Sequence, residues 1–198
     1  MMENLKLRIT DMMATAILAI IIFLDDILDV LKTVVITSVV CLVIVNWFFM
    51  PIQVQGTSMN PQLLNKSLGF ASIISKKVSG IQRFDIVVIK VDDNDNLVKR
   101  VIGMPGDNII YTDDTLIING EIYTEDFLDP EYVKSQLTAG GQFTKDFEYD
   151  VPEGEYFCLG DNRLVSQDSR AYGPFKEEHI LSKGIFVIYP FKVFGIAK

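Results

Sequence analysis

The chain has few of the side chains on which catalysis and cross-linking most often depend. Its 198 residues include one histidine and two cysteines. The histidine, His179, stands in a charged stretch that is typical of a solvated helix turn, so a Ser-His-Asp triad is not expected. Cys41 falls in an apolar run and Cys158 lies far from it, and neither has His or Cys neighbours. We therefore expect two unpaired thiols and no metal site.

Basic residues are also scarce. Lysine and arginine together number 18 against 26 acidic residues, which gives a formal net charge of -8. A nucleic-acid-binding protein would present a basic face to the phosphate backbone, so nucleic acid is not an expected partner. The chain also lacks internal repeats and low-complexity segments, which excludes repeat architectures.

Apolar sequence is plentiful and is concentrated before residue 51. Residues 12–24 and 33–50 form two apolar runs, separated by a short stretch that contains three aspartates and one lysine. The second run has 18 uncharged residues and would make a helix of about 27 Å, close to a hydrocarbon core of about 30 Å. The first is short for a span and suits a buried or interfacial helix. We predict a cytoplasmic or interfacial segment over 1–30 and a single transmembrane helix over 31–50, with a two-helix hairpin as the alternative.

The basic residues near the apolar runs predict an orientation. Lys6, Arg8 and Lys32 precede the span, whereas residues 50–65 contain neither lysine nor arginine. Because cytoplasmic flanks carry an excess of basic residues, we expect the N-terminus in the cytoplasm and residues 51–198 outside the plasma membrane.

Beyond residue 51 the pattern becomes that of β-strands. Residues 85–90 and 96–102 are continuous and β-branched, and the acidic turn between them indicates a hairpin. Further short apolar runs, punctuated by turn residues, lie at 109–111, 116–118, 156–159 and 184–189. We predict a mostly β domain over 51–198, built of coiled antiparallel sheets or a barrel. Residues 126–147 interrupt this rhythm with a weak helical pattern around 131–137, and we interpret them as a lid or small cap.

A lysine can replace histidine as the base for a serine when its amine is buried, because desolvation lowers its pKa from about 10.4 by several units. In a strand over 96–102, alternation places Lys99 on one face with Leu97 and Val101, and Arg100 on the other. On periodicity alone, an exposed Lys99 or a buried ion pair is the better supported interpretation. Other lysines stand in polar or loop-like sequence: Lys66, Lys76, Lys77, Lys134, Lys145 and Lys183.

Two polar segments are candidates to complete a site around Lys99. Residues 55–61, Gln-Gly-Thr-Ser-Met-Asn-Pro, place Ser58 shortly after the span. Turn chemistry would explain such a serine, although Gly56 would let the backbone approach a substrate and nearby amides could hold an anion. Residues 160–170, Gly-Asp-Asn-Arg-Leu-Val-Ser-Gln-Asp-Ser-Arg, are either ordinary hydrogen-bonded turns or a polar network that supports a site.

Together these segments resemble the type I signal peptidases, the S26-type Ser-Lys endopeptidases, in their compact Gram-positive form. The order of span, Ser motif, hairpin, Lys motif and Asp-Asn-Arg loop is similar. Residues 99–107 match that family's Lys-Arg-x-x-Gly-x-Pro-Gly-Asp pattern, and residues 160–170 match its Gly-Asp-Asn-Arg-x-x-Ser-x-Asp-Ser-Arg stretch throughout. Two positions depart from the commonest pattern: Phe84 stands where Gly is frequent, and Gln62 stands where Thr is common.

The resemblance implies the central chemistry. Ser58 would be the acylated nucleophile and neutral Lys99 the general base, with water releasing the acyl-enzyme. Met59 and Pro61 complete the serine motif and would contact the substrate. No cofactor or metal is implied.

The resemblance also implies supporting residues. Ser166 would hydrogen-bond to the Lys99 amine and orient it, while Asp168 and Arg170 would form an ion pair beside it. The backbone N–H of the nucleophile and a main-chain donor at Gly56 would hold the oxyanion.

The implied activity is that of a membrane-bound serine endopeptidase, which removes signal peptides from exported preproteins after small residues of the Ala-x-Ala kind. Its partners would be signal-peptide-bearing preproteins and the lipid bilayer, near the protein secretion machinery. One alternative is a self-cleaving repressor of the same fold, but such proteins are cytosolic and carry a DNA-binding domain that this sequence does not show. Another is a catalytically inactive homologue that binds exported proteins.

Overall fold

The chain folds into two units, and the computed structural model describes residues 2–92, 95–137 and 141–197. The first unit is Met1–Trp47 and the second is Phe48–Lys198. The division falls close to the change of composition near residue 51. Every residue considered above for catalysis belongs to the second unit.

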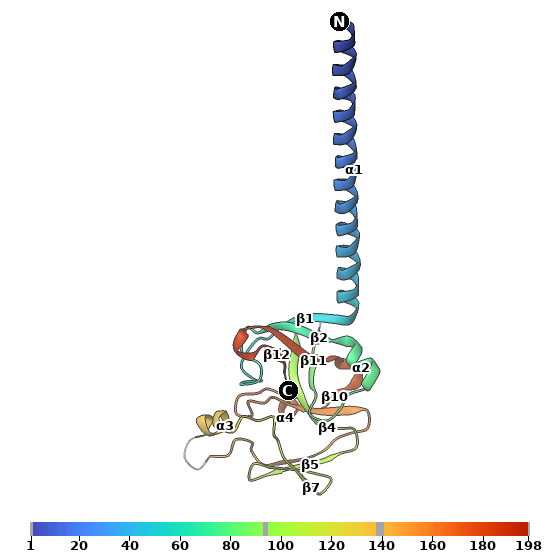
Figure 1. Ribbon diagram of the computed structural model, residues 1–198. Helices are drawn as coiled ribbons and strands as arrows, with labels where there is room; N and C mark the ends of the chain where they lie inside the picture. Colours follow the sequence, from blue (N-terminus) through green and yellow to red (C-terminus); the bar gives the residue numbers. More distant parts are fainter. Residues whose placement is uncertain (1, 93–94, 138–140, 198) are drawn as a thin grey trace. The chain divides into compact units, whose positions relative to one another are not determined.

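The first unit is one continuous helix, α1 (Met2–Phe48), drawn in blue in Figure 1. The charged residues between the two apolar runs do not interrupt it, and Lys32 Nζ donates to Asp29 Oδ1 at 2.9 Å across one turn, a spacing that helices favour. The structure thus has one helix where the hairpin alternative requires two. From Met12 to Phe48 this helix is long and apolar enough to cross a membrane.

The helix ends two residues before the predicted end of the span. The chain enters β1 (Phe49–Gln53), which pairs antiparallel with β2 (Leu68–Ser72). Pro51, within β1, has no backbone N–H and cannot continue a helix. Neither strand is predicted from the sequence, because residues 49–50 extend the apolar run and β2 contains a glycine.

The second unit is mostly β, as predicted, and its strands form two antiparallel sheets (Figure 1). The first sheet has the order β1-β2-β11-β3-β4-β9-β10, with β12 paired to β11, and the second has the order β7-β6-β5-β8. The remaining strands of the first sheet are β3 (Ile86–Lys90), β4 (Asn96–Gly103), β9 (Glu155–Leu159), β10 (Phe175–Lys176), β11 (Ile180–Tyr189) and β12 (Gly195–Ile196). Those of the second are β5 (Asn108–Thr112), β6 (Thr115–Ile118), β7 (Glu121–Tyr123) and β8 (Phe147–Asp150).

Short helices connect the strands: α2 (Ile73–Ser79), α3 (Pro130–Gln136), α4 (Ser169–Tyr172) and the 3₁₀ turns η1 (Glu177–His179) and η2 (Phe191–Val193). The weak helical pattern around 131–137 is α3, which Asp129 caps by accepting from the first backbone N–H groups. His179 is exposed in η1, as the sequence analysis expects.

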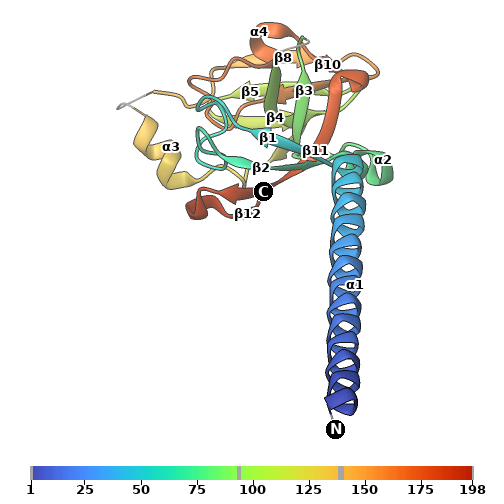
Figure 2. The ribbon, with the colours of Figure 1, turned by 90° about the horizontal axis from the view of Figure 1, so that it is seen from above.

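The predicted hairpin is β3 and β4, whose register pairs Val87 with Lys99. Figure 2 shows β3 and β4 within the sheet, with β11 beside β3. Both strands contribute to hydrophobic clusters on their two faces: Val88 packs in one cluster, whereas Val87 packs with Val101 in another, and Ile102 belongs to a third. The middle of β4 is therefore desolvated from both sides, which positions its charged side chains inside the domain.

Candidate active site

A cleft of about 460 Å³ lies beside β4. Its walls include residues 53–55, at the end of β1 and just after it, and residues 95–99, which belong to β4 and the turn before it. Ser58 and Lys99 both line this cleft, so the structure brings together the two residues that the resemblance pairs. Tyr172 of α4 lines it as well.

The side chains of Lys99 and Ser58 are in direct contact. Lys99 Nζ donates to Ser58 Oγ at 2.8 Å. Lys99 is 2% exposed, and its neighbours on the same face of β4, Leu97 and Val101, pack in one hydrophobic cluster with Cys158. The alternation in β4 therefore buries the amine between apolar side chains, and the exposed alternative for Lys99 is excluded.

This burial changes the acidity of the amine. Desolvation is the main cause that lowers the pKa of Lys99 to about 8. The Asp168 carboxylate opposes this shift, and the Arg170 guanidinium adds to it. Lys99 forms no ion pair within the described part of the chain, because the nearby carboxylates of Asp161 and Asp168 are engaged by arginines.

Lys183 corrects one expectation. The sequence analysis places it in polar company, but β11 buries it to 6% exposure. Its Nζ donates to Asp85 Oδ2 at 2.8 Å. This ion pair distinguishes the buried Lys183 from Lys99, whose amine donates to a hydroxyl.

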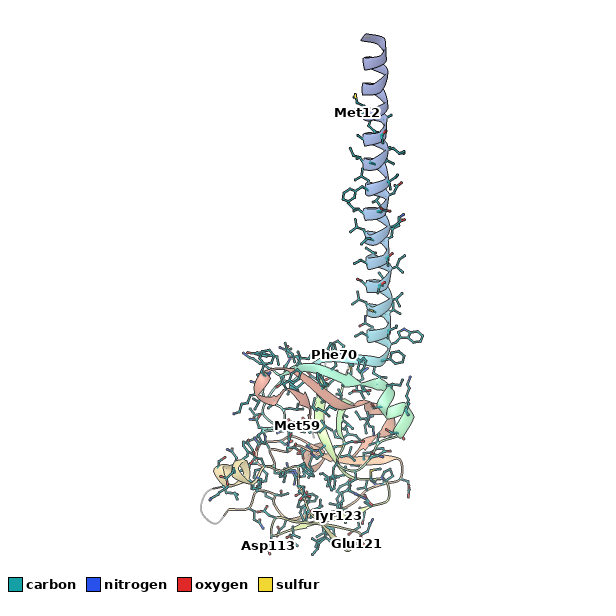
Figure 3. The ribbon with its side chains drawn as sticks, in the orientation of Figure 1. Met12, Met59, Phe70, Asp113, Glu121 and Tyr123 are labelled. Atoms are coloured by element: carbon teal, nitrogen blue, oxygen red, sulfur yellow. The ribbon has the colours of Figure 1, made fainter. Side chains whose placement is uncertain are left out.

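The turn that carries Ser58 sends adjacent side chains in opposite directions. Ser58 lines the cleft, whereas Met59, labelled in Figure 3, is 1% exposed and packs in the core in one cluster with Leu63. Pro61 is half-buried and is also absent from the cleft lining. Neither residue lines the cleft in this structure, so the substrate contacts expected of Met59 and Pro61 stay a prediction. Met59 instead anchors the turn to the core.

The backbone beside Ser58 is held by hydrogen bonds. Gly56 adopts a left-handed φ of 86°, and its N–H donates to Asn65 Oδ1 at 3.0 Å, so the main-chain donor expected at Gly56 is already occupied. Asn162 fixes the neighbouring carbonyls: its N–H donates to Ser58 O at 2.9 Å and its Nδ2 donates to Thr57 O at 3.2 Å. The backbone N–H of Ser58 remains the candidate oxyanion donor.

Residues 160–170, called here the catalytic loop, pack closely against this turn. A Cβ at Gly160 would lie 2.5 Å from Ser58 O, so only glycine permits the approach. Asp168 accepts from the Gly160 N–H at 3.0 Å and forms the predicted ion pair with Arg170 through two hydrogen bonds of 2.8 Å. Burial alone would raise the pKa of Asp168, but these hydrogen bonds hold it below its ordinary value.

Ser166 differs from the implied arrangement. Its Oγ is buried next to Gly160 and makes no well-formed hydrogen bond among the described residues, although it lies close enough to Asp168 to help lower the pKa of that carboxyl. The expected hydrogen bond to the Lys99 amine is therefore absent from this structure, in which the amine donates to Ser58 Oγ.

Other buried charged residues lie near the contact between Lys99 and Ser58, and no role was predicted for them from the sequence. Arg100 donates through Nε and Nη2 to the two Asp161 carboxylate oxygens at 2.8 and 2.7 Å, and both side chains are at most 2% exposed. This pair joins β4 to the catalytic loop. Both residues lie inside the matched motifs, so the motifs could have identified them as part of the site. Glu125, which pairs with Arg163, lies outside every motif and has no such signal.

The two thiols and the possible metal ligands give no second candidate site among the described residues. Cys41 and Cys158 are free thiols, and burial raises the pKa of the Cys158 thiol, which keeps it protonated beside the amine. Among the side chains that the structure describes, no three His, Cys, Asp or Glu residues group in a way that would hold a metal ion.

Comparison with known proteins gives consistent matches. The family model described as "Signal peptidase, peptidase S26" matches residues 27–189. Signal peptidase I V of Bacillus subtilis (strain 168) is 40% identical over 154 residues, which cover 74% of this chain and 90% of that protein. Signal peptidase IB of Staphylococcus aureus (strain COL) is 33% identical over 180 residues, which cover 85% and 93%. A crystal structure of a signal peptidase I from Enterococcus faecalis V583 aligns with a TM-score of 0.48 and 39% identity, covering 52% of this chain and 95% of that one.

Replacing Lys99 with methionine is expected to stabilise the fold. A pKa lowered from about 10.4 to about 8 means that the buried ammonium costs the folded state up to about 3 kcal/mol at pH 7. Between pH 8 and 10.4 the unfolded chain binds more protons at this residue, so the wild type gains stability as pH rises. The difference in Tm between Lys99→Met and wild type should therefore shrink from pH 7 to pH 10.

Lys183→Met is the matched control, because it removes a buried lysine that has a carboxylate partner and should lower Tm at pH 7. Thermal unfolding by circular dichroism measures both variants. A Lys99→Met variant less stable than wild type at pH 7 would contradict an unpaired, desolvated amine.

Proposed function

The chain belongs to the signal peptidase family, peptidase S26, and is a serine peptidase that cleaves signal peptides; we propose that Ser58 is its nucleophile and Lys99 its general base. The observation that carries the proposal is the 2.8 Å contact between Lys99 Nζ and Ser58 Oγ in a cleft that a substrate can enter. A pKa of about 8 leaves roughly a tenth of the amine neutral at pH 7, enough to act as a base.

The proposed reaction runs through an acyl-enzyme. Neutral Lys99 takes the Ser58 proton as Oγ attacks the peptide carbonyl carbon, and the Ser58 N–H donates to the developing oxyanion. The carbon–nitrogen bond then breaks, and the lysinium protonates the departing amine. Water, deprotonated by the same amine, releases the acyl group and regenerates the serine.

The edge of β4 supports binding of the substrate as an added strand. Asn96 to Lys99 pair with β3 on one side, while the pairing with β9 on the other side begins only at Arg100. An extended peptide in the cleft would use this open edge. Its alternate side chains would face the same wall, which would place a size requirement on the first and third residues before the cut. Branched side chains such as Val54 and Leu97 line that wall and favour small residues there, as in Ala-x-Ala.

The length and composition of α1 support a location in the plasma membrane. We propose that residues 31–48, the helical part of the predicted span, cross the bilayer, with the basic residues Lys6 and Arg8 on the cytoplasmic side and the β domain outside. A preprotein emerging from the secretion machinery would then present its cleavage site to the domain that contains Ser58.

An exposed apolar surface on the β domain also supports the bilayer as a partner. Phe186 and Phe194 have ring centroids 5.3 Å apart, and Tyr189 and Phe191 have centroids 6.2 Å apart, yet all four are 42–79% exposed. Ile196 pairs with Phe186 and is 71% exposed. Soluble surfaces rarely gather such side chains, and aromatic residues favour the lipid headgroup region.

Ser58→Ala and Lys99→Ala should each reduce cleavage of a preprotein by about 10⁴-fold or more, because the two residues act as one unit. The assay uses detergent-solubilised protein and gel-resolved cleavage, with Lys183→Ala as a control. Full activity in either variant would remove the assignment, and an inactive wild type would favour the alternative of a non-catalytic homologue.

A substrate series tests the cleft. Replacing alanine by leucine at the first or third residue before the mapped cut should lower kcat/KM by at least about tenfold, whereas the same change at the second residue should have little effect. Equal losses at all three positions would count against an extended peptide lying along β4.

The orientation has its own test. Protease added to intact cells should digest residues 51–198 and spare a tag placed before Met1. Digestion of the tag and protection of the β domain would reverse the proposed topology.

A further inference from the structure

The segment of residues 125–127, called here the brace, follows β7 at the start of the excursion that the sequence analysis interprets as a lid or cap. We propose that Glu125 is a positioning residue for the reaction, and that the brace holds in register the three segments that build the site: the turn of Ser58, the strand of Lys99 and the catalytic loop. This inference rests on the proposed function, since it concerns the geometry of Ser58 and Lys99. Figure 3 labels Tyr123, the last residue of β7 before the brace.

Glu125 is the ion-pair partner of a fully buried arginine. Both terminal nitrogens of Arg163 donate to the Glu125 carboxylate, and the Arg163 side chain has no exposed surface. Arg163 Nη1 also donates to Tyr111 Oη at 2.8 Å and to Thr144 Oγ1 at 3.1 Å. Without its carboxylate, the buried guanidinium would carry an uncompensated charge. Glu125 therefore fixes the position of the Arg163 guanidinium.

Arg163 in turn connects both ends of the catalytic loop. Its Nε donates to Gly160 O at 3.1 Å, and its carbonyl oxygen accepts from Arg170 Nη2 at 2.8 Å. Gly160 packs against Ser58 O, and Arg170 holds Asp168 in its ion pair. A shift of the Arg163 guanidinium would therefore move the loop against the nucleophile turn.

Phe127 links the brace to the other two segments. Its ring lies over the Arg100 guanidinium, 4.1 Å from Cζ to the centroid, directly beside Lys99 in the chain. Its carbonyl oxygen accepts from Gln62 Nε2 at 3.1 Å, four residues after Ser58.

The two residues that depart from the commonest family pattern, Gln62 and Phe84, both contact Phe127 of the brace. Gln62 donates to the Phe127 carbonyl, and the Phe84 ring packs against the Phe127 ring with centroids 5.1 Å apart. Both departures thus contact the brace rather than the cleft. The brace therefore contacts the segment after Ser58, the strand of Lys99 and, through Arg163, the catalytic loop.

The expected kinetic effect follows from where the brace lies. None of its residues lines the cleft, so substrate binding should be unaffected. A misplacement of the nucleophile by about 1 Å costs about 100-fold in rate. Glu125→Gln keeps the shape and removes the charge, so kcat should fall about 10- to 100-fold while KM changes less than about twofold.

The experiment measures kcat and KM of the full-length protein in detergent with one preprotein, at a temperature well below each variant's measured Tm. Asp85→Asn is the matched control, because it neutralises another partly buried carboxylate that pairs with a basic residue outside the brace. Phe127→Leu, which removes the ring from Arg100, should lower kcat about threefold and gives a second variant should Glu125→Gln fail to fold. The double variant Glu125→Gln/Arg163→Gln should be no slower than Arg163→Gln alone, because Glu125 acts through Arg163.

The outcomes separate the two proposals. Ser58→Ala is run in the same assay, and its retained activity would overturn the proposed function itself. An inactive Ser58→Ala beside a Glu125→Gln variant as fast as Asp85→Asn would overturn the brace alone. A double variant much slower than Arg163→Gln, or a loss that appears in KM with kcat unchanged, would also overturn the positioning role.

Discussion

A lysine ammonium taken out of water without a carboxylate partner destabilises a fold, and the architecture of the β domain imposes that state on Lys99. Alternation along β4 turns the side chain into a hydrophobic cluster, and its nitrogen meets Ser58 Oγ at 2.8 Å. The cost of burial lowers the pKa toward the range where the amine can accept a proton. Stability and reactivity at this position are therefore opposed, as they often are at active sites.

The surrounding ion pairs keep the amine unpaired. Asp161 and Asp168 both attract Lys99 and raise its pKa, but each is held by two hydrogen bonds from an arginine, Arg100 and Arg170 respectively. The arginines thus supply the charge balance that Lys99 would otherwise provide. The carboxylates order the loop beside the nucleophile without forming an ion pair with the base.

Much of this could be predicted from the sequence where periodicity or a motif acts locally. The β3–β4 hairpin follows from the strand pattern, whereas the burial of Lys99 without an ion pair and the Asp168–Arg170 pair follow from the resemblance. Contacts within irregular turns could not be predicted, because a turn has no repeating pattern of side chains. Met59 packs in the core, and the Gly56 N–H donates to Asn65, nine residues along the chain. Contacts such as that between Glu125 and Arg163, 38 residues apart, are set by tertiary packing alone.

The pH dependence of kcat/KM for a preprotein tests the central claim most directly, because it reports the ionisation of the base in the free enzyme. The account predicts a single ascending limb, about tenfold per pH unit, that levels off above a midpoint near pH 8. A midpoint near 6.5 would indicate a histidine, and one near 10.4 a solvated lysine. Either result, or a rate independent of pH, would contradict a desolvated Lys99 acting on Ser58.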